Sequence, residues 1–266
     1  MLLLAALAAA CLLAGFLLLR SPPPAPSAED GYAEEGALLA QVATVPPPAR
    51  SPLRLGRVAP LRSSGELSRW AAVLRQADAR KGPDSAARVV ARVASETTLG
   101  TTNIVLVLEH VVTDEGVWVR VRMPALPGNT TGWLPRAVLG GYHFLRTHLV
   151  IDRARYTITL LREGRAVFRA PIGIGREQWP TPKGEFYVRE RLTKLDSPFY
   201  GPVAFGTSAR SRVLTDWPDG GQIGIHGTSR PELIPGEISH GCVRMRNADI
   251  LRLSRLLPVG TPLTIV

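Results

Sequence analysis

The stretch Gly224-Ile-His-Gly-Thr-Ser-Arg-Pro-Glu-Leu-Ile-Pro-Gly-Glu-Ile-Ser-His-Gly-Cys-Val-Arg-Met-Arg-Asn247 concentrates reactive side chains in few residues. It contains two of the 5 histidines and Cys242, whereas the other cysteine, Cys11, lies in an apolar N-terminal segment. A thiol attacks carbonyl carbons as the thiolate, and an ordinary cysteine is mostly protonated at neutral pH, so Cys242 needs a nearby base. His226 precedes it across a segment with prolines and glycines that can fold back. The stretch therefore predicts an active site whose resting nucleophile is a Cys242 thiolate paired with a His226 imidazolium.

The residues around Cys242 have possible roles of their own. Gly241 has no Cβ, which leaves room for a substrate carbonyl, and its N–H together with that of Cys242 can face a developing oxyanion. Ser239 either donates to substrate or supports the turn. His240 either binds substrate or braces the turn by hydrogen bonding, and bracing is the preferred role. The alternatives are a small buried hydrophobe for Cys242 and a satisfied core histidine for His226. Polar neighbours such as Ser239 are unfavourable in an apolar core, which favours the catalytic interpretation of Cys242.

Two segments of this stretch carry a family resemblance. Ile225-His-Gly-Thr228 and Ser239-His-Gly-Cys-Val-Arg-Met245 together resemble the signature of YkuD-type L,D-transpeptidases, bacterial enzymes that cross-link peptidoglycan. Upstream, Thr181-Pro-Lys-Gly-Glu-Phe186 looks like the family's Thr-Pro-x-Gly-x-Phe/Tyr strand entry. The resemblance covers Thr147 to Val266, and Arg244 stands where many members of the family have asparagine.

The resemblance implies a role for several matching residues. Cys242 is the nucleophile, His226 is the general base, and the carbonyl of Gly227 orients the imidazole ring. The implied reaction is a two-step acyl transfer on peptidoglycan stem peptides: D-alanine leaves, a 3→3 cross-link forms, and no cofactor is needed. The resemblance also implies acylation of the thiol by carbapenems. Two alternatives stay open, an L,D-carboxypeptidase-type hydrolase acting on the same peptides and a non-catalytic wall-binding protein.

Other residues near the motif are candidates for binding substrate. Arg244 either holds a substrate carboxylate by a bidentate pair or caps a neighbouring carbonyl. Tyr200, with Phe199, belongs either to a lid over the site or to ordinary loop packing. The two histidines of the stretch and Cys242 are also potential zinc ligands. No second cysteine pair or carboxylate lies at ligand spacing, so we expect no metal.

Length and composition bound the class of protein. The 266 residues, 45% of them hydrophobic, suffice for two compact domains and a leader. The formal net charge is +10, but the sequence shows no long basic tract and no nucleic-acid-binding motif, so nucleic acid is not expected as a partner. The charge is compatible with a polyanionic cell-wall polymer. Because Cys11 falls in the leader, Cys242 has no disulfide partner in the folded part, and an unpaired thiol in an exported protein suggests a reactive one.

The N-terminal part of the chain predicts export. Residues 1–19 carry no charged side chain, and residues 1–20 are predicted to be a signal peptide or a membrane anchor. Residues 21–62 are rich in proline and alanine and are predicted to be a linker. This organisation predicts a protein of the bacterial cell envelope, outside the cytoplasm, either anchored in the membrane or secreted into the wall.

Residues 63–141 are predicted to form a helix followed by a small β module. Ser63 and Glu66 make a capping box, after which apolar residues from 67 to 77 share one helical face until Gly82-Pro83. Short alternating strands and polar turns then resemble a bacterial SH3-like module. We expect strands at 89–93, 103–112, 117–123 and 132–135, with Trp118 and Trp133 packed in the barrel rather than forming a glycan-stacking platform.

Residues 142–266 are predicted to form the catalytic domain. A strand at 222–225 should deliver His226, a flap at 194–206 should cover the site, and Asn247 should cap a short helix. The fold class is therefore mainly β, with a YkuD-type sheet domain and one short C-terminal helix behind the small SH3-like domain. Further strands are expected at 149–152, 156–161, 166–173, 186–191 and 261–266.

Overall fold

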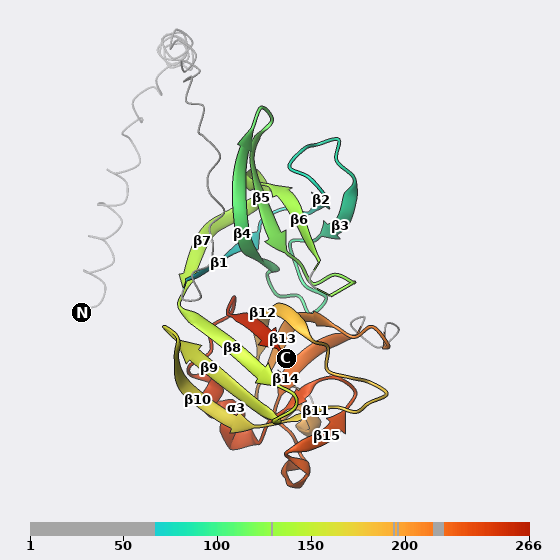
Figure 1. The fold of residues 1–266 in the computed structure, drawn as a ribbon, viewed down its shortest axis with the longest axis vertical. Helices are drawn as coiled ribbons and strands as arrows, with labels where there is room; N and C mark the ends of the chain where they lie inside the picture. The colour runs from blue at the N-terminus through green and yellow to red at the C-terminus, as the bar shows by residue number, and fades with distance from the viewer. Residues whose placement is uncertain (1–66, 129, 194, 196, 215–220) are drawn as a thin grey trace, which may run out of the picture. The chain divides into compact units, whose positions relative to one another are not determined.

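The computed structural model describes residues 67–128, 130–193, 195, 197–214 and 221–266, which all belong to one compact unit, Leu55–Val266. In this part of the chain the strands form two sheets and the fold is mainly β, as the sequence predicts (Figure 1). The predicted leader, the linker and the capping box lie outside the described residues. Within those residues, no helix is long and apolar enough to cross a membrane.

The N-terminal sheet has 7 strands in the order β3-β2-β6-β5-β4-β1-β7. Alternation along its strands builds a core of its own: in β5, Val119 and Val121 are fully buried, and the intervening Arg120 is half-buried. Trp118 is also buried, in agreement with the packing role expected for it. Whether this sheet is an SH3-like module stays a prediction. Its elements are β1 (Ser68–Val73), β2 (Ala77–Arg80), β3 (Val89–Val93), β4 (Ile104–Thr113), β5 (Gly116–Arg122), β6 (Thr131–Pro135), the 3-10 turn η1 (Arg136–Val138) and β7 (Leu139–Leu145).

The helix predicted to run up to Gly82-Pro83 is wrong, because β1 and β2 occupy this segment. Strand β1 lies between β4 and β7 and pairs with both. Its burial follows a period of two, with Ala71 and Val73 in the core, while the following Leu74 is 60% exposed. The apolar spacing fits a strand as well as a helix, and pairing with two distant strands overrides the local helical preference.

The C-terminal sheet has 10 strands in the order β10-β9-β8-β17-β12-β13-β14-β16-β11-β15. Most predicted strands are present here, but β13 and the short strands on either side of Cys242 were not predicted. These three strands shape the site. β13 and β16 pair with β14, and β15 and β16 lie on either side of Cys242. The elements are β8 (Thr147–Asp152), β9 (Thr157–Arg162), β10 (Arg165–Pro171), β11 (Gly173–Gly175), β12 (Gly184–Leu192), η2 (Pro198–Tyr200), β13 (Ala204–Arg210), β14 (Gln222–His226), η4 (Pro231–Leu233), β15 (Gly236–Ser239), β16 (Val243–Arg244), α3 (Asn247–Ser254) and β17 (Pro262–Ile265).

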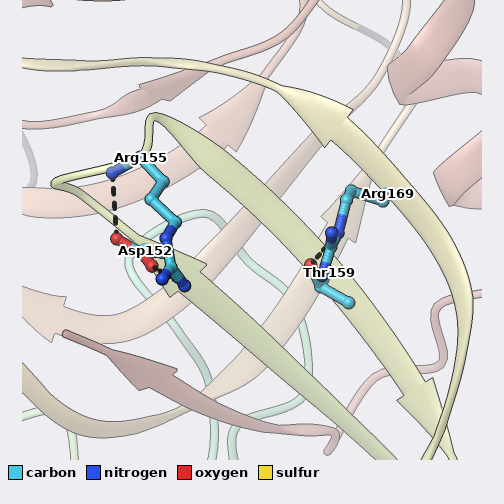
Figure 2. Close-up of polar contacts among 4 residues, drawn as sticks. All are labelled: Asp152, Arg155, Thr159 and Arg169. Atoms are coloured by element: carbon cyan, nitrogen blue, oxygen red, sulfur yellow. Dashed lines mark hydrogen bonds and ion pairs between the residues drawn. The ribbon is translucent and has the colours of Figure 1, made fainter.

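Polar contacts fix the hairpins β8–β9 and β9–β10 at one edge of this sheet (Figure 2). In the first turn, Asp152 accepts a hydrogen bond from the Arg155 backbone N–H at 3.0 Å, and its other oxygen lies 3.4 Å from the Arg155 guanidinium. On the next strand pair, Arg169 Nε donates to Thr159 Oγ1 at 3.2 Å. Both contacts are on partly exposed side chains, so they serve the geometry of the turns more than the stability of the fold.

Helix α3 packs its apolar face into the core of the C-terminal sheet, where Ile250 and Leu253 are fully buried. The capping role predicted for Asn247 is wrong: Arg246 is the N-cap residue, and no side chain makes a capping hydrogen bond. Asn247 Oδ1 instead accepts the backbone N–H of Thr228 at 2.9 Å. The side chain has turned away from its helix to hold the loop that follows the predicted base, His226.

The two sheets make buried polar contacts with each other. The hydroxyl of Tyr187 in β12 donates to the carbonyl of Ile104 in β4 at 2.8 Å, and Tyr187 is 0% exposed. Two residues further along β12, Arg189 Nε donates to Asn103 Oδ1 at 3.1 Å. A small apolar cluster of Tyr187, Ile104 and Leu106 surrounds these contacts. Nothing in the local sequence pattern predicts this interface, because its partners are more than eighty residues apart.

Candidate active site

Cys242, His226 and Arg244 lie on one face of two parallel strands. β14 ends at His226, and β16 begins directly after Cys242. In their pairing Ile225 lies opposite Val243. His226 lies opposite Arg244. Residues that are opposite each other, or two apart on a strand, share a face, so the three polar side chains share one side while Ile225 and Val243 are fully buried on the other. Strand register thus brings the predicted nucleophile and base together.

Gly224 keeps the space between those two side chains open. Its N–H donates to Cys242 Sγ at 3.3 Å. A Cβ at Gly224 would lie 3.9 Å from that sulfur and 4.0 Å from His226 Cδ2, so both reactive side chains border the same small space. A larger residue at position 224 would put its side chain between them.

The imidazole of His226 is held by the backbone of the next residue. Nδ1 lies 2.6 Å from the carbonyl oxygen of Gly227, and a carbonyl oxygen only accepts, so Nδ1 carries the proton. In the neutral ring Nε2 is then the nitrogen that can take up a proton. Gly227 itself fits tightly, because a Cβ there would lie 2.3 Å from Asn247 Oδ1. The contact implied by the family resemblance is present, and the catalytic role of both residues stays a prediction.

The pKa shifts of Cys242 and His226 bear on the resting ionisation of the pair. Burial lowers the pKa of His226 to about 4, against the opposing effect of its hydrogen bond to Gly227, and the charge of Arg244 lowers it further. Burial raises the pKa of the Cys242 thiol, against the opposing effects of the Gly224 N–H and Arg244, although the residue keeps part of its surface accessible. Both shifts favour a neutral thiol and a neutral imidazole over the expected thiolate–imidazolium pair.

The turn before Cys242 is held by two buried hydroxyls. Ser239 accepts the N–H of Gly241 at 3.0 Å and donates to the carbonyl of Cys242 at 2.6 Å. Thr181 donates to the carbonyl of Gly241 at 2.7 Å. Of its two predicted roles, Ser239 therefore fills the structural one. Because the Gly241 N–H already bonds to Ser239, the structure does not support its predicted oxyanion role, and the N–H of Cys242 remains the candidate donor.

Gly241 is needed for the shape of this turn. Its φ of +116° is a conformation that side-chain-bearing residues rarely adopt, and a Cβ would lie 2.9 Å from Ile223 Cδ1. The neighbouring His240 is exposed, and its ring centroid lies 4.2 Å from that of Trp179. His240 thus packs against Trp179 and also lines the larger cavity beside Cys242, and both its bracing and its substrate-binding role stay predictions.

Arg244 combines burial with an unsatisfied donor. It is 7% exposed, and its guanidinium lies 4.4 Å from the centroid of Phe199. Its Nε is buried and makes no hydrogen bond to any described residue. Burial lowers its pKa, with the Cys242 charge acting in the opposite direction. A buried guanidinium with an unmatched N–H is suited to an anion from outside, which favours carboxylate binding over the capping of a carbonyl.

Two aromatic rings cover His226. Phe199 and Tyr200 belong to η2, and their ring centroids lie 6.0 Å and 5.0 Å from that of His226. Each is 40% exposed, so the rings stand between the imidazole and solvent. This position fits a lid better than ordinary loop packing.

Two cavities meet at Cys242 and His226. The larger, of about 320 Å³, is lined on one side by Arg176, Arg230 and Arg244. The smaller has a volume of about 240 Å³ and a mainly apolar lining. Gln222 borders both cavities, but the sequence analysis did not single it out, although its place two residues before Gly224 puts it on the same strand face. Arg176 and Arg230 were also missed. Arg176 lies in a loop outside the motifs, and Arg230 lies between the two motif segments of the reactive stretch.

The described residues contain no group of three or more His, Cys, Asp or Glu side chains that could hold a metal ion. The three residues that raised the zinc alternative divide between the space above Gly224, which Cys242 and His226 border, and the exposed ring of His240.

Comparison with known proteins finds one similar family. Residues 146–265, less than half of the chain, match the family model of the L,D-transpeptidase catalytic domain, YkuD. This segment is similar to YkuD-type catalytic domains. YkuD of Bacillus subtilis (strain 168), an L,D-transpeptidase by name, is 33% identical over 118 residues, which make up 44% of this chain and 65% of that protein. YkuD of Bacillus licheniformis is 34% identical over 109 residues, or 41% of this chain and 59% of that protein. The chain thus matches less than two thirds of the length of either relative.

A solved structure is similar as well. Bd1075 of Bdellovibrio bacteriovorus has 28% sequence identity and a TM-score of 0.37, with 46% of this chain and 47% of that chain covered. The similarity to YkuD-type proteins is therefore carried by the sequence matches. Those matches coincide with the sheet that carries Cys242 and His226. The N-terminal sheet precedes the matched segment.

Proposed function

We propose that this protein is an L,D-transpeptidase that forms 3→3 cross-links in peptidoglycan through an acyl-enzyme on Cys242. The observation that carries the proposal is the shared space above Gly224, bordered by the sulfur of Cys242 and the ring of His226. The hydrogen bond from Nδ1 to Gly227 leaves Nε2 as the base, which fixes the tautomer needed for proton transfer.

In the first step the neutral pair acts together. Nε2 of His226 takes the thiol proton as the sulfur attacks the carbonyl of the diamino acid in a tetrapeptide stem. The C–N bond to D-alanine then breaks, the amine leaves with the proton returned by His226, and a thioester remains. The backbone N–H of Cys242 is the proposed donor to the intermediate's oxyanion, an interaction that contributes about 3 kcal/mol in comparable sites.

In the second step a side-chain amine of a neighbouring stem captures the thioester. The larger cavity is suited to the donor stem, because such peptides carry several carboxylates and the cavity offers Arg176, Arg230 and the unmatched Nε of Arg244. Tyr200 and Phe199 would close over the bound stem and exclude water, which would otherwise hydrolyse the thioester.

We further propose that the protein works in the bacterial cell envelope, outside the cytoplasm, on peptidoglycan as its polymeric partner. The apolar residues 1–19 would serve as signal peptide or membrane attachment and residues 21–62 as a tether. The N-terminal sheet is proposed to be the SH3-like module of the sequence-based expectation. Secretion of a reporter fused to residues 1–62, and its retention in the membrane fraction, would test the leader directly.

The decisive experiment incubates the soluble protein, residues 55–266, with purified tetrapeptide muropeptides and separates the products. We expect 3→3 dimers, released D-alanine and, with a carbapenem, a mass increase that maps to Cys242. Tripeptides without dimers would favour the carboxypeptidase-type hydrolase. No acyl-enzyme, no D-alanine and no β-lactam adduct would overturn the proposal and favour a wall-binding protein.

A further inference from the structure

The two cavities that meet at Cys242 differ in charge. The larger one carries three arginines and is suited to carboxylates. The smaller one is lined by apolar side chains and neutral polar groups apart from the reactive pair itself. Its lining comprises Leu99, Leu192, Leu195, Tyr200, Ala204, Phe205, Gly206, Gln222, Gly224, His226 and Cys242. An acyl transfer has two substrates, and this asymmetry offers each of them a different environment at the same sulfur.

One wall of the smaller cavity comes from the N-terminal sheet. Leu99 stands at the tip of the loop between β3 and β4, and it is 42% exposed. The loop is a tight hairpin, in which Thr97 and Thr101 pair through their backbones at 2.8 Å and Gly100 has a φ of +72°. Leu99 is therefore presented by a defined turn rather than by a loose segment.

A buried carboxylate ties this turn to the catalytic sheet. Glu190 of β12 is 2% exposed and accepts hydrogen bonds from the hydroxyls of Thr97 at 3.0 Å and Thr101 at 2.6 Å. Its other oxygen accepts from Gln222 Nε2 at 3.0 Å, and Gln222 borders both cavities. At Gly206, a Cβ would lie 2.6 Å from both Glu190 Oε1 and Gln222 Nε2, so the contact needs glycine there. The turn that carries Leu99 and the strand that carries His226 are thus positioned by one carboxylate.

We propose that Leu99 is a specificity-determining residue of the acceptor site, and that the smaller cavity receives the aliphatic side-chain arm of the acceptor's diamino acid. This inference rests on the proposed transpeptidase function. Methylene groups of such an arm gain free energy when they leave water for apolar walls. The N-terminal sheet is then part of the active site, rather than a separate binding module.

The character of the cavity also suits the chemistry of the second step. An amine attacks only in its neutral form, and an apolar environment disfavours the ammonium ion. The amine nitrogen forms the new C–N bond, His226 Nε2 takes its proton, and the C–S bond breaks so that the sulfur leaves and recovers a proton from the imidazolium. The products are the cross-linked amide and the free thiol, and no further reactant is needed.

The test compares two amines that capture the same acyl-enzyme. Tetrapeptide muropeptide is the donor, and the acceptor is either a tripeptide muropeptide, which needs the cavity for its arm, or hydroxylamine, which is too small to need it. For Leu99→Asp we expect the ratio of tripeptide capture to hydroxylamine capture to fall about tenfold or more. For Leu99→Ser the ratio should fall by less. The matched control is Leu74→Asp, since Leu74 is 60% exposed on the same sheet and lines neither cavity. Its ratio should equal that of the wild type.

The outcomes separate this inference from the proposed function. If the wild type forms no acyl-enzyme, the proposed function fails before the second amine is added. If the wild type cross-links and both Leu99 variants keep the wild-type ratio, the acceptor assignment is wrong while the transpeptidase stands. Capture by hydroxylamine reports folding in each variant, and a variant that fails to fold leaves the milder Leu99→Ser to decide. A fall in both captures by the same factor would also reject the inference, because that pattern belongs to a structural effect on the acyl-enzyme.

Discussion

The two sheets reach the reactive centre in different ways. The C-terminal sheet sets the positions of Cys242 and His226 through the register of β14 and β16. The N-terminal sheet reaches the same space through one turn, whose hydroxyls are bonded to Glu190. Register fixes which side chains share a face before any side-chain contact is considered. A turn depends on a few polar contacts instead, so its position can change without a change in the register that places the reactive pair.

The largest effect should come from the register-positioned pair. Cys242→Ala removes the nucleophile, and we expect cross-linking to fall to the background rate, a loss of at least about a thousandfold. Cys242→Ser should behave alike, because a serine hydroxyl beside a weakly basic imidazole is a poor nucleophile. Dimer formation is measured with thermal unfolding as the control for folding. If a folded Cys242→Ala protein kept its cross-linking activity, Cys242 could not be the nucleophile that the strand register positions.

The second effect tests how tightly the base is oriented. In Gly227→Ala the new Cβ would lie 2.3 Å from Asn247 Oδ1 and 3.0 Å from Gly201 Cα, so the loop must shift and carry the Gly227 carbonyl with it. We expect a loss of about a hundredfold in the acylation rate, since displacement of a catalytic group by about 1 Å has this cost. Gly141→Ala is the control, because a Cβ at Gly141 meets nothing within 4 Å. Equal acylation rates for the two variants would show that the carbonyl does not position the ring.

The sequence predicts the reactive residues and the strand that delivers His226, but it did not predict β16, whose register with β14 places Cys242. The motif predicted the strand that delivers His226, the contact of that ring with Gly227, and the proximity of Cys242, all of which depend on residues close together in the chain. The pKa shifts that favour a neutral pair could not be predicted, because they depend on burial by distant residues. For the same reason the sequence-based analysis assigned the Gly241 N–H to an oxyanion, whereas Ser239 accepts it.

The turn-dependent part of the site could not be predicted. Glu190 and Gln222 have no motif around them, and their partners Thr97 and Thr101 are separated from Glu190 by about ninety residues. The segment of β1 and β2 was also predicted to be a helix, because its apolar spacing fits the period of a helix as well as that of a strand. The strands that pair with β1, namely β4 and β7, lie far along the chain. Local sequence patterns thus identified the reactive residues, whereas contacts between distant segments determine what surrounds them.

The third prediction concerns the pH dependence of stability, which distinguishes a neutral Cys242–His226 pair from a thiolate–imidazolium pair. The folded protein holds the pKa of His226 at about 4, whereas an unfolded chain has the ordinary value near 6.5, so only the unfolded state takes up this proton between the two. Stability from this group is therefore complete above about pH 6.5 and is lost as the pH falls toward 4, by roughly 3 kcal/mol in total. Denaturant unfolding of the wild type and of His226→Asn measures the difference in stability, which should shift against the wild type by that amount between about pH 6.5 and pH 4.

The thiol gives an independent readout of the same question. Because the pKa of Cys242 is raised, the rate of its alkylation by iodoacetamide should keep increasing from about pH 5 to about pH 9. A thiolate–imidazolium pair would instead give a rate that levels off in the acid range. A plateau of that kind would show that the resting pair is charged, and the neutral mechanism would have to be abandoned.

The smallest effect should come from the contact between the sheets. Tyr187→Phe removes the hydroxyl that donates to the buried carbonyl of Ile104 at 2.8 Å, and it leaves that carbonyl without this partner. We expect a loss of about 1 kcal/mol in the free energy of unfolding, seen as a fall of a few degrees in Tm. Tyr156→Phe is the control, since Tyr156 is half-buried and its hydroxyl makes no hydrogen bond to a described residue. If the two sheets depend on each other as the Glu190 contacts suggest, Tyr187→Phe should also lower tripeptide capture slightly more than hydroxylamine capture. A loss of stability with an unchanged capture ratio would mean that the Glu190 contacts alone position the turn.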